Sequence, residues 1–313
     1  MRVRAIFRAI ETGLSGPSSI LQAKIFYPAS EPQTDDERNS GILPPLPTDS
    51  PRKTIIFLNG INCPPESYSW LAHQMCERGH LFVTFNLIAD GLPGGMHALT
   101  PGLDMQFMTA DGHGKGPTGS AIAPILDDLA KLNSGGLLSG QIDLEHIILA
   151  GHSAGGSVAL LNSEYFPQIK AVFSYGAHTQ GSTMMGFEPG TIMPINPDIP
   201  VLMFGGDSDG VISWSARRYG KEAEDSSISL RDTFDRGIAG TRGDRYLAIL
   251  KGGTHFTFAD PKDPTTGRPF LETPGENDPA LRTLMTELIA DFIDGKNIAG
   301  FADNDKIAYF ASK

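Results

Sequence analysis

The sequence feature that most constrains the fold is a strand-turn-helix pattern in the middle of the chain. The turn is Gly151-His152-Ser153-Ala154-Gly155-Gly156, and it follows an apolar run, His146-Ile147-Ile148-Leu149-Ala150. Only glycine-sized neighbours fit where a strand turns sharply into a helix, so the pattern favours a buried strand, a tight turn and a helix. Such a turn lifts the Ser153 hydroxyl out of the sheet and aims the N–H of Ala154 at a point where an oxyanion can form.

The same Gly-x-Ser-x-Gly pattern occurs a second time, in Gly206-Asp207-Ser208-Asp209-Gly210, again after an apolar run. Charge separates the two matches. Two carboxylates flank Ser208, and their negative charge opposes a developing oxyanion, whereas Ser153 has only His152 and Ala154 beside it. We therefore predict that Ser153 is a nucleophile and that the second match has another role.

Length and charge narrow the class of protein. At 313 residues the chain is long enough for one large α/β domain, and we expect residues 1–313 to form it. The 25 basic and 36 acidic residues give a net charge of −11. This balance argues against a nucleic-acid or anionic-membrane partner, because such partners need a basic surface.

Cysteine usage and apolar runs indicate the compartment. Cys63 and Cys76 are too few for a disulfide framework and match no metal-binding spacing, so we expect free thiols, with a single bridge as the alternative. No apolar run is long enough to span a membrane, and the first residues lack a leader pattern. A soluble, cytoplasmic protein is the expectation.

Strands that alternate with helices predict a doubly wound, mostly parallel sheet of eight strands. The expected strands cover residues 3–13, 19–28, 53–58, 81–85, 146–150, 169–175, 200–205 and 246–250. The first two flank a turn rich in glycine and serine and should pair as an antiparallel hairpin. Helices are expected at 66–79, 120–133, 154–165, 213–223 and 278–294.

The remaining stretches lack a regular period. Residues 29–52 are rich in Pro, Ser, Asp and Glu, which predicts a mobile surface loop. Residues 88–119 and 176–199 carry glycines, prolines and scattered Met and Phe, and we expect these long loops to border a site. The polar stretch 224–242 and the tail 295–313 have no interpretable pattern. Asp303-Asn304-Asp305 in that tail lacks the glycine and glutamate of a calcium loop.

Three chemically suited side chains follow three expected strands. Ser153 follows 146–150, Asp209 lies just past 200–205, and His255 lies just past 246–250. A serine hydroxyl needs a base within hydrogen-bond reach, and that base needs a group that fixes its tautomer. Such groups collect beyond the carboxyl ends of strands in open α/β sheets. We therefore predict a Ser153-Asp209-His255 triad, with Asp207 as the competitor for the acid.

These residues give the chain a resemblance to the α/β-hydrolase superfamily, and within it to the single-domain branch of dienelactone hydrolases, chlorophyllases and cutinase-like polyester hydrolases. The resemblance runs from about Lys53 to Phe292. It rests on Phe57-Leu58-Asn59-Gly60-Ile61, Gly151-His152-Ser153-Ala154-Gly155-Gly156, Gly205-Gly206-Asp207-Ser208-Asp209-Gly210 and Gly253-Thr254-His255-Phe256.

The resemblance implies that the family's nucleophile, acid and base correspond to Ser153, Asp209 and His255. It also implies that the backbone N–H groups of Ile61 and Ala154 form the oxyanion hole, with Asn62 as the alternative to Ile61. The chain departs from the pattern in two places. Asn59-Gly60 stands where many members have His-Gly, and Ser153 stands where dienelactone hydrolases proper use cysteine.

A second group of residues is predicted to bind substrate. Met184 and Met185, in the 176–199 loop, could wall an apolar pocket, although core filling is the usual role of methionine. His178 and Asn62 are expected to border the same site, as is His97 from the other long loop, and the remaining histidines apart from His255 are expected to be structural. Gly114-Lys115-Gly116-Pro117-Thr118-Gly119 matches a dinucleotide fingerprint, but it follows no convincing strand. We expect no cofactor and no metal.

The sequence thus predicts a serine carboxylic-ester hydrolase that works through an acyl-enzyme on a small-molecule ester with an apolar portion. The same machinery serves thioesterases, acyltransferases and polyester depolymerases, so these alternatives stay open. The alternative of another class is a non-catalytic binding protein that keeps the fold.

Overall fold

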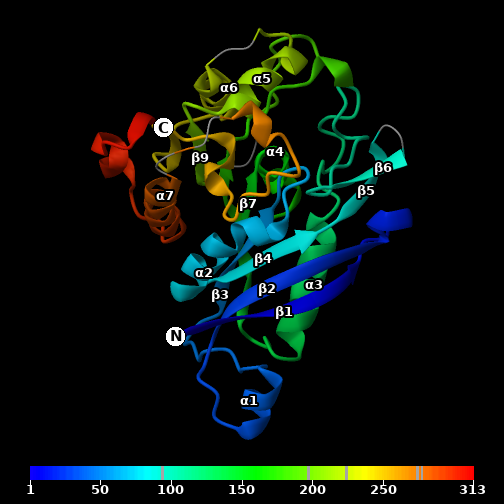
Figure 1. Ribbon diagram of the computed structural model, residues 1–313, viewed down its shortest axis with the longest axis vertical. Coiled ribbons are helices and arrows are strands. Elements are labelled where there is room, and N and C mark those ends of the chain that lie inside the picture. The colour runs from blue at the N-terminus through cyan, green and yellow to red at the C-terminus, as the bar shows by residue number, and fades with distance from the viewer. Residues whose placement is uncertain (93–94, 196–197, 223–224, 273–274, 276–277) are drawn as a thin grey trace.

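The computed structural model describes residues 1–92, 95–195, 198–222, 225–272, 275 and 278–313. Within these residues one nine-stranded sheet runs through the molecule in the order β1-β2-β4-β3-β7-β8-β9-β10-β11 (Figure 1). Its strands are β1 (Arg2–Glu11), β2 (Ile20–Ala29), β3 (Arg52–Leu58), β4 (Leu81–Asn86), β7 (Ile142–His152), β8 (Ile169–Tyr175), β9 (Val201–Gly206), β10 (Arg245–Leu250) and β11 (Ile307–Ser312).

The six central strands pair in parallel, and in sheet order they are β4, β3, β7, β8, β9 and β10. Antiparallel pairs lie at both edges, formed by β1 with β2, β2 with β4, and β10 with β11. The predicted mostly parallel sheet with an N-terminal antiparallel hairpin is therefore confirmed. The predicted number of eight strands was wrong, because the described tail contributes β11. This edge strand does carry a short apolar run, Ile307-Ala308-Tyr309-Phe310-Ala311, but it is mostly half-exposed and follows a polar stretch, and the strand was not recognised in the tail.

Helices cover both faces of the sheet (Figure 1). One face packs against α2 (Ser69–Glu77) and α7 (Asp278–Ile293). The other packs against α3 (Ile122–Ser134), α4 (Ala154–Asn162) and α6 (Ser226–Asp232). The apolar spacing predicted for α3 is the reason it forms, because its buried side chains lie on one face, and each stabilises the fold by about 1.5–3 kcal/mol. Those side chains are Ile122, Ile125, Leu126, Leu129 and Leu132.

Several boundaries differ from the sequence expectation. The helix expected at 213–223 begins earlier, as α5 (Gly210–Ser215), because the Asp209 side chain caps it, and a 3₁₀ turn then spans Ala216–Tyr219. The helix expected at 66–79 starts as a 3₁₀ turn, Pro65–Tyr68, before α2. The helix expected at 154–165 leaves the α form after Asn162 and ends in a 3₁₀ turn.

The stretches expected to be loops, and the polar stretch 224–242, contain regular structure. Residues 29–52 include α1 (Asp35–Ser40), which Thr34 and Glu37 begin with a reciprocal capping box. Residues 88–119 include a separate hairpin of β5 (Ile88–Leu92) and β6 (Met96–Leu99). Residues 224–242 include α6 and a π-helical turn, Thr233–Gly237. Residues 93, 94, 196, 197, 223 and 224 of the expected loops and helix lie outside the described residues.

Five parallel strands, β3, β7, β8, β9 and β10, direct their carboxyl ends to one edge of the sheet. The segments that follow them begin at residues 59, 153, 176, 207 and 251. Functional groups in open α/β sheets collect at this edge, so these five segments frame the candidate site.

Candidate active site

Ser153 occupies the sharp turn between β7 and α4. Its φ and ψ are 56° and −125°, and among the described residues only Asn62 and Ser153 are non-glycines with positive φ. A Cβ at Gly151 would lie 2.4 Å from the Gly155 carbonyl, and one at Gly155 would lie 2.2 Å from the Leu58 oxygen. The glycines are therefore required by backbone contact, and the strained conformation is of the kind found at functional sites.

Two neighbouring segments approach Ser153 at the sheet edge. Its N–H donates to the Tyr175 carbonyl at the end of β8, at 2.9 Å. On the other side, a Cβ at Gly60 would lie 3.3 Å from the Ser153 Cβ. The serine is thus held between the segments after β3 and β8, and its side chain is only partly buried.

Asp209 and His255 form a buried pair beside this turn. His255 Nδ1 lies 2.8 Å from Asp209 Oδ2, and each residue is 2% exposed. Asp209 Oδ1 accepts the Ile212 N–H at 2.7 Å, which is the cap of α5. Asp207 is exposed instead, and its Oδ1 accepts the Gly252 N–H at 2.7 Å. Of the two candidate acids, Asp209 is the one in contact with the imidazole.

The His255 ring packs close to the serine turn. Its centroid lies 4.7 Å from that of His152, the residue before Ser153. A Cβ at Gly176 would lie 3.0 Å from His255 Nδ1 and 3.3 Å from Asp209 Oδ2, so the end of β8 touches both members of the pair. A direct hydrogen bond from Ser153 Oγ to His255 is absent from the described part of the chain. Catalytic hydrogen bonds are often long without substrate and tighten only in the complex.

The two predicted oxyanion donors belong to the segment after β3 and to the first turn of α4. Ala154 is the first residue of α4, where an N–H has no intrahelical partner. Ile61 follows Gly60, and its N–H has no hydrogen-bond acceptor among the described residues. The N–H of Asn62 donates to the Leu99 carbonyl at 2.8 Å, while Asn62 Oδ1 accepts the Leu99 N–H at 3.1 Å. Asn62 therefore ties the segment after β3 to β6, and its own N–H is occupied.

Glu272 contacts the segments that carry Asp209 and His255, and the sequence analysis did not predict it. Its Oε1 accepts the Gly210 N–H at 2.9 Å, and its Oε2 accepts the Phe256 N–H at 3.4 Å. The carboxylate thereby joins the residue after Asp209 to the residue after His255. Burial, followed by the neighbouring charge of Asp209, raises the pKa of Glu272. Glu272 belongs to a stretch rich in Pro and Gly whose path has no periodic signal, so no sequence pattern could have revealed it.

The residues predicted to bind substrate have different environments. His178 is buried, its ring meets Tyr219 edge-on at 4.6 Å, and burial lowers its pKa to about 4. Met184 is 77% exposed and Met185 is partly buried. The Met185 carbonyl accepts the Ala110 N–H at 2.9 Å, which joins the two loops expected to border the site. The substrate-binding roles of these residues stay predictions.

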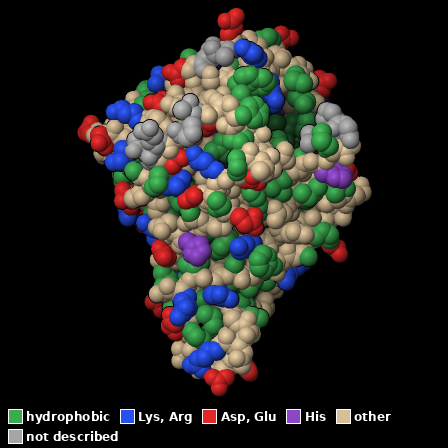
Figure 2. All heavy atoms as spheres, viewed as in Figure 1, with side chains coloured by type: hydrophobic (Ala, Val, Ile, Leu, Met, Phe, Trp, Pro, Cys, Tyr) green, Lys and Arg blue, Asp and Glu red, His purple; other side chains and the backbone are tan. Residues whose placement is uncertain are grey.

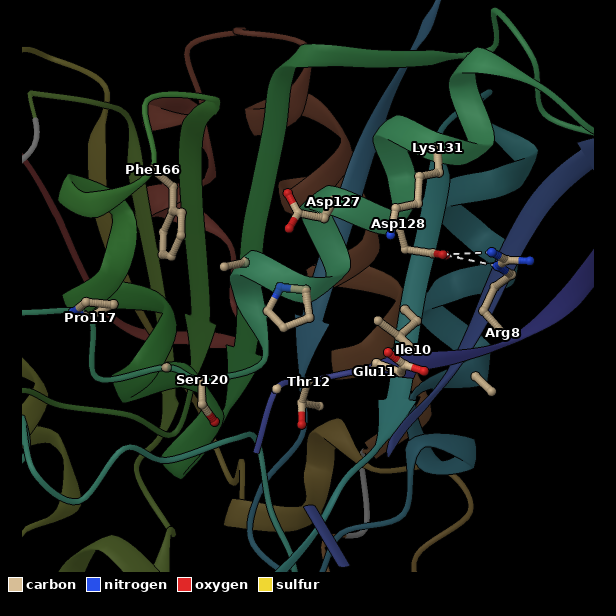
Figure 3. Close-up of a pocket in the computed structure, with 15 residues that line it drawn as sticks. Arg8, Ile10, Glu11, Thr12, Pro117, Ser120, Asp127, Asp128, Lys131 and Phe166 are labelled. Atoms are coloured by element: carbon tan, nitrogen blue, oxygen red, sulfur yellow. Dashed lines mark hydrogen bonds and ion pairs between the residues drawn. The ribbon is translucent and has the colours of Figure 1, made fainter. Parts of the chain in front are cut away.

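A cavity of about 660 Å³ lies elsewhere, between β1 and α3 (Figure 3). Arg8 donates to both oxygens of Asp128 at its wall, at 3.0 and 2.7 Å. Asp127, Lys131 and Phe166 also line it, but none of the predicted site residues does. Arg8 and Asp128 form an ion pair in its wall, and the cavity does not border the serine turn.

The described residues contain no group of three or more His, Cys, Asp or Glu side chains arranged to hold a metal ion. Among the described helices, none combines the length and the apolar character that crossing a bilayer requires. Cys63 and Cys76 are both buried and unbridged.

No family model and no curated protein matches the chain. A solved structure, a ferulic acid esterase from Streptomyces cinnamoneus, resembles it with a TM-score of 0.56. The likeness covers 94% of this chain and 89% of that chain, at 15% sequence identity. The chain has an α/β-hydrolase fold. At this identity the likeness concerns the fold alone, and the α/β-hydrolase fold supports many chemistries, so function must be argued from the site.

Proposed function

We propose that the chain is a serine carboxylic-ester hydrolase with Ser153, Asp209 and His255 as its triad. The observation that carries the proposal is the buried Asp209–His255 pair, at 2.8 Å, next to a serine held at positive φ. The ends of β7, β9 and β10 supply these groups in the chain order Ser, Asp, His, which is the order of the α/β-hydrolases. A structural serine would not require the strained turn.

The tautomer of His255 follows from its partner. A carboxylate accepts only, so Nδ1 carries the proton that faces Asp209, and Nε2 keeps its lone pair. Nε2 takes the proton of Ser153 as Oγ attacks the ester carbonyl carbon, and Asp209 stays ionised and stabilises the imidazolium. The imidazolium then returns the proton to the leaving alkoxide as the C–O bond breaks. An alcohol leaves, and an acyl-enzyme remains.

The second half repeats these steps with water. His255 removes a proton from water, the hydroxide attacks the acyl carbon, and Ser153 Oγ leaves as it regains the proton, which releases the acid. In both halves the N–H groups of Ile61 and Ala154 donate to the oxyanion. Loss of one such donor reduces kcat by about 10²- to 10³-fold in other serine hydrolases.

The substrate is proposed to carry an apolar portion. Three exposed apolar side chains come from segments around α5: Met184, Trp214 and Phe270 are 77%, 43% and 79% exposed. Ser182 and Thr183 donate to the Arg218 carbonyl, at 3.3 and 3.1 Å, which joins the Met184 segment to the turn after α5. Figure 2 shows a hollow bordered by hydrophobic side chains in the upper part of the molecule, between α5 and the β5–β6 hairpin in Figure 1. The similar solved structure is an esterase, which supports an ester as the substrate and does not bear on its apolar portion.

The test is an acyl-chain-length series of aryl esters, assayed with the wild type, Ser153→Ala and Ser208→Ala. We expect hydrolysis by the wild type and by Ser208→Ala, and loss of activity to the background rate in Ser153→Ala. Equal hydrolysis by Ser153→Ala and the wild type would refute the proposal. A hydroxamate trap on the same esters separates hydrolysis from acyl transfer.

A further inference from the structure

A buried polar cluster lies under the proposed site and has no part in the chemistry described so far. It consists of Asn59, Tyr68 and His152, which are 1%, 0% and 0% exposed. Asn59 follows β3, Tyr68 precedes α2, and His152 ends β7. Buried polar groups are costly unless they are hydrogen-bonded, so their bonds indicate what the cluster holds in place.

Asn59 acts on the peptide that carries the proposed oxyanion donor. Its Nδ2 donates to the Gly60 carbonyl at 3.0 Å and to the Cys63 carbonyl at 3.1 Å. The carbonyl of Gly60 and the N–H of Ile61 belong to one planar trans peptide and point in opposite directions. A donor that anchors the carbonyl therefore also fixes the direction of the Ile61 N–H.

Tyr68 holds the preceding peptide of the same segment. The Gly60 N–H donates to the Tyr68 hydroxyl at 3.3 Å, and this hydroxyl lies 2.9 Å from His152 Nδ1. His152 Nε2 lies 3.0 Å from the backbone carbonyl of His255. A carbonyl can only accept, so Nε2 carries the proton and Nδ1 accepts from the Tyr68 hydroxyl.

The charge state of His152 agrees with this assignment. Burial, followed by the neighbouring His255, lowers the pKa of His152 well below its ordinary value, so the ring is neutral. A neutral ring with Nε2–H leaves Nδ1 free to accept. The hydroxyl of Tyr68 gives its only proton to that nitrogen and receives the Gly60 N–H on its oxygen.

We propose that the Asn59–Tyr68–His152 cluster is a positioning device, which fixes the Ile61 N–H and the backbone of His255 relative to one another on either side of Ser153. The proposal rests on the proposed function, since it needs an oxyanion and a base. There is little space for adjustment in between, because a Cβ at Gly60 would lie 3.2 Å from His152 Nδ1 and 3.3 Å from the Ser153 Cβ. A small shift of either peptide would therefore move a catalytic group, and preorganised donors lose effect when displaced.

The experiment compares Tyr68→Phe with Tyr27→Phe. Tyr27 is also buried, and its hydroxyl donates to a backbone carbonyl, that of Leu43, at 2.8 Å. It belongs to β2, whereas the cluster residues lie after β3, before α2 and at the end of β7. The two variants lose a comparable buried hydroxyl, so the Tyr27 variant controls for a loss of stability alone.

In Tyr68→Phe we expect kcat for an aryl ester to fall by about 10-fold or more, which is smaller than the loss caused by removing an oxyanion donor altogether. KM should stay within about twofold of the wild-type value. The inhibition constant of an aryl trifluoromethyl ketone, which forms an oxyanion on an active serine, should rise by the same factor. Tyr27→Phe should leave both constants unchanged. Asn59→Leu removes the side-chain donor to the Gly60 carbonyl, which then keeps only the Cys63 N–H at 3.1 Å, and it should reproduce the Tyr68→Phe result. It therefore serves as the test if Tyr68→Phe does not fold.

The proposal would be overturned if folded Tyr68→Phe had the wild-type kcat and inhibition constant. If Tyr68→Phe does not fold, the same result in folded Asn59→Leu would overturn it. Either result would leave the proposed function intact. A wild type that neither hydrolyses aryl esters nor binds the ketone would overturn the proposed function, and the positioning role with it.

Discussion

Replacement of Asp209 by asparagine gives a sharp prediction, because the structure determines how the new amide must sit. Asp209 has two partners: Oδ1 accepts the Ile212 N–H at 2.7 Å and Oδ2 faces His255 Nδ1 at 2.8 Å. An asparagine has one oxygen and one NH₂ group in place of two acceptors. One of the two partners must therefore face the NH₂ group.

The backbone partner cannot change. The Ile212 N–H always donates, whereas neutral His255 can move its proton from Nδ1 to Nε2. The oxygen of the asparagine should therefore stay with Ile212 and keep the cap of α5, whose loss would cost about 0.5–2 kcal/mol. Its NH₂ group then faces His255 Nδ1, which becomes an acceptor, and Nε2 carries a proton where Ser153 needs a base.

We expect Asp209→Asn to fold with nearly wild-type stability and to lose about 10³- to 10⁴-fold in kcat, as the equivalent change in a serine protease does through the wrong tautomer. The assay is aryl-ester hydrolysis across pH, with thermal unfolding of the same samples. The matched control is Asp207→Asn, because Asp207 is exposed and accepts from Gly252 and Ser208 rather than from His255.

Asp207→Asn should change kcat by less than about twofold, since its side chain is exposed and accepts from the Gly252 N–H and the Ser208 hydroxyl. A folded Asp209→Asn that keeps a tenth or more of wild-type kcat would refute the reasoning. A large loss in Asp207→Asn alone would show instead that Asp207 is the acid.

Three further predictions follow from the site and the core. Glu272→Gln should lower kcat by about 10-fold with KM nearly unchanged in steady-state assays, because glutamine has one accepting oxygen and its NH₂ group must face either the Gly210 or the Phe256 N–H. Wild-type kcat would leave Glu272 without a positioning role. Met184→Ala combined with Met185→Ala should raise KM for long-chain esters more than for acetates, and equal effects on both would count against an apolar pocket. Burial lowers the pKa of His80 from 6.5 to about 4. Between these pH values the unfolded chain therefore binds more protons than the folded chain does. The contribution of His80 should lower the free energy of unfolding by about 3 kcal/mol from pH 7 to pH 4. In His80→Gln, urea unfolding at several pH values should show a free energy of unfolding that falls less from pH 7 to pH 4 than in the wild type. An equal fall in the variant and the wild type would contradict this prediction.

The central sheet could be predicted from the sequence because its strands are buried on both sides. Such strands contain continuous apolar runs, as in Val201–Phe204 of β9 and Tyr246–Leu250 of β10, and the alternation of strands and helices predicts their parallel order. The β5–β6 hairpin carries no such run and was missed for this reason. β11 has a short apolar run, Ile307–Ala311, but it is a half-exposed edge strand that follows a polar stretch, so its run was not read as a strand. The helix α1 was missed because its stability comes from local capping rather than from an apolar face.

The candidate site was predictable where a residue stands directly beyond a strand. Ser153, Asp209 and His255 follow β7, β9 and β10, so topology alone brings them to one edge. The groups that hold them were not predictable, because they approach through space. Glu272 reaches Gly210 across 62 positions, and Tyr68 reaches His152 across 84. Nothing in the local sequence of Glu272 or Tyr68 signals these contacts.

The central claim is that one serine, Ser153, becomes a nucleophile at the edge of this sheet. The most direct measurement is reaction of the folded chain with a fluorophosphonate, followed by peptide mass spectrometry that locates the adduct. The account predicts a single adduct on Ser153, its absence in Ser153→Ala and its retention in Ser208→Ala. Absence of an adduct on the wild type, or an adduct on any other serine that persists in Ser153→Ala, would contradict it.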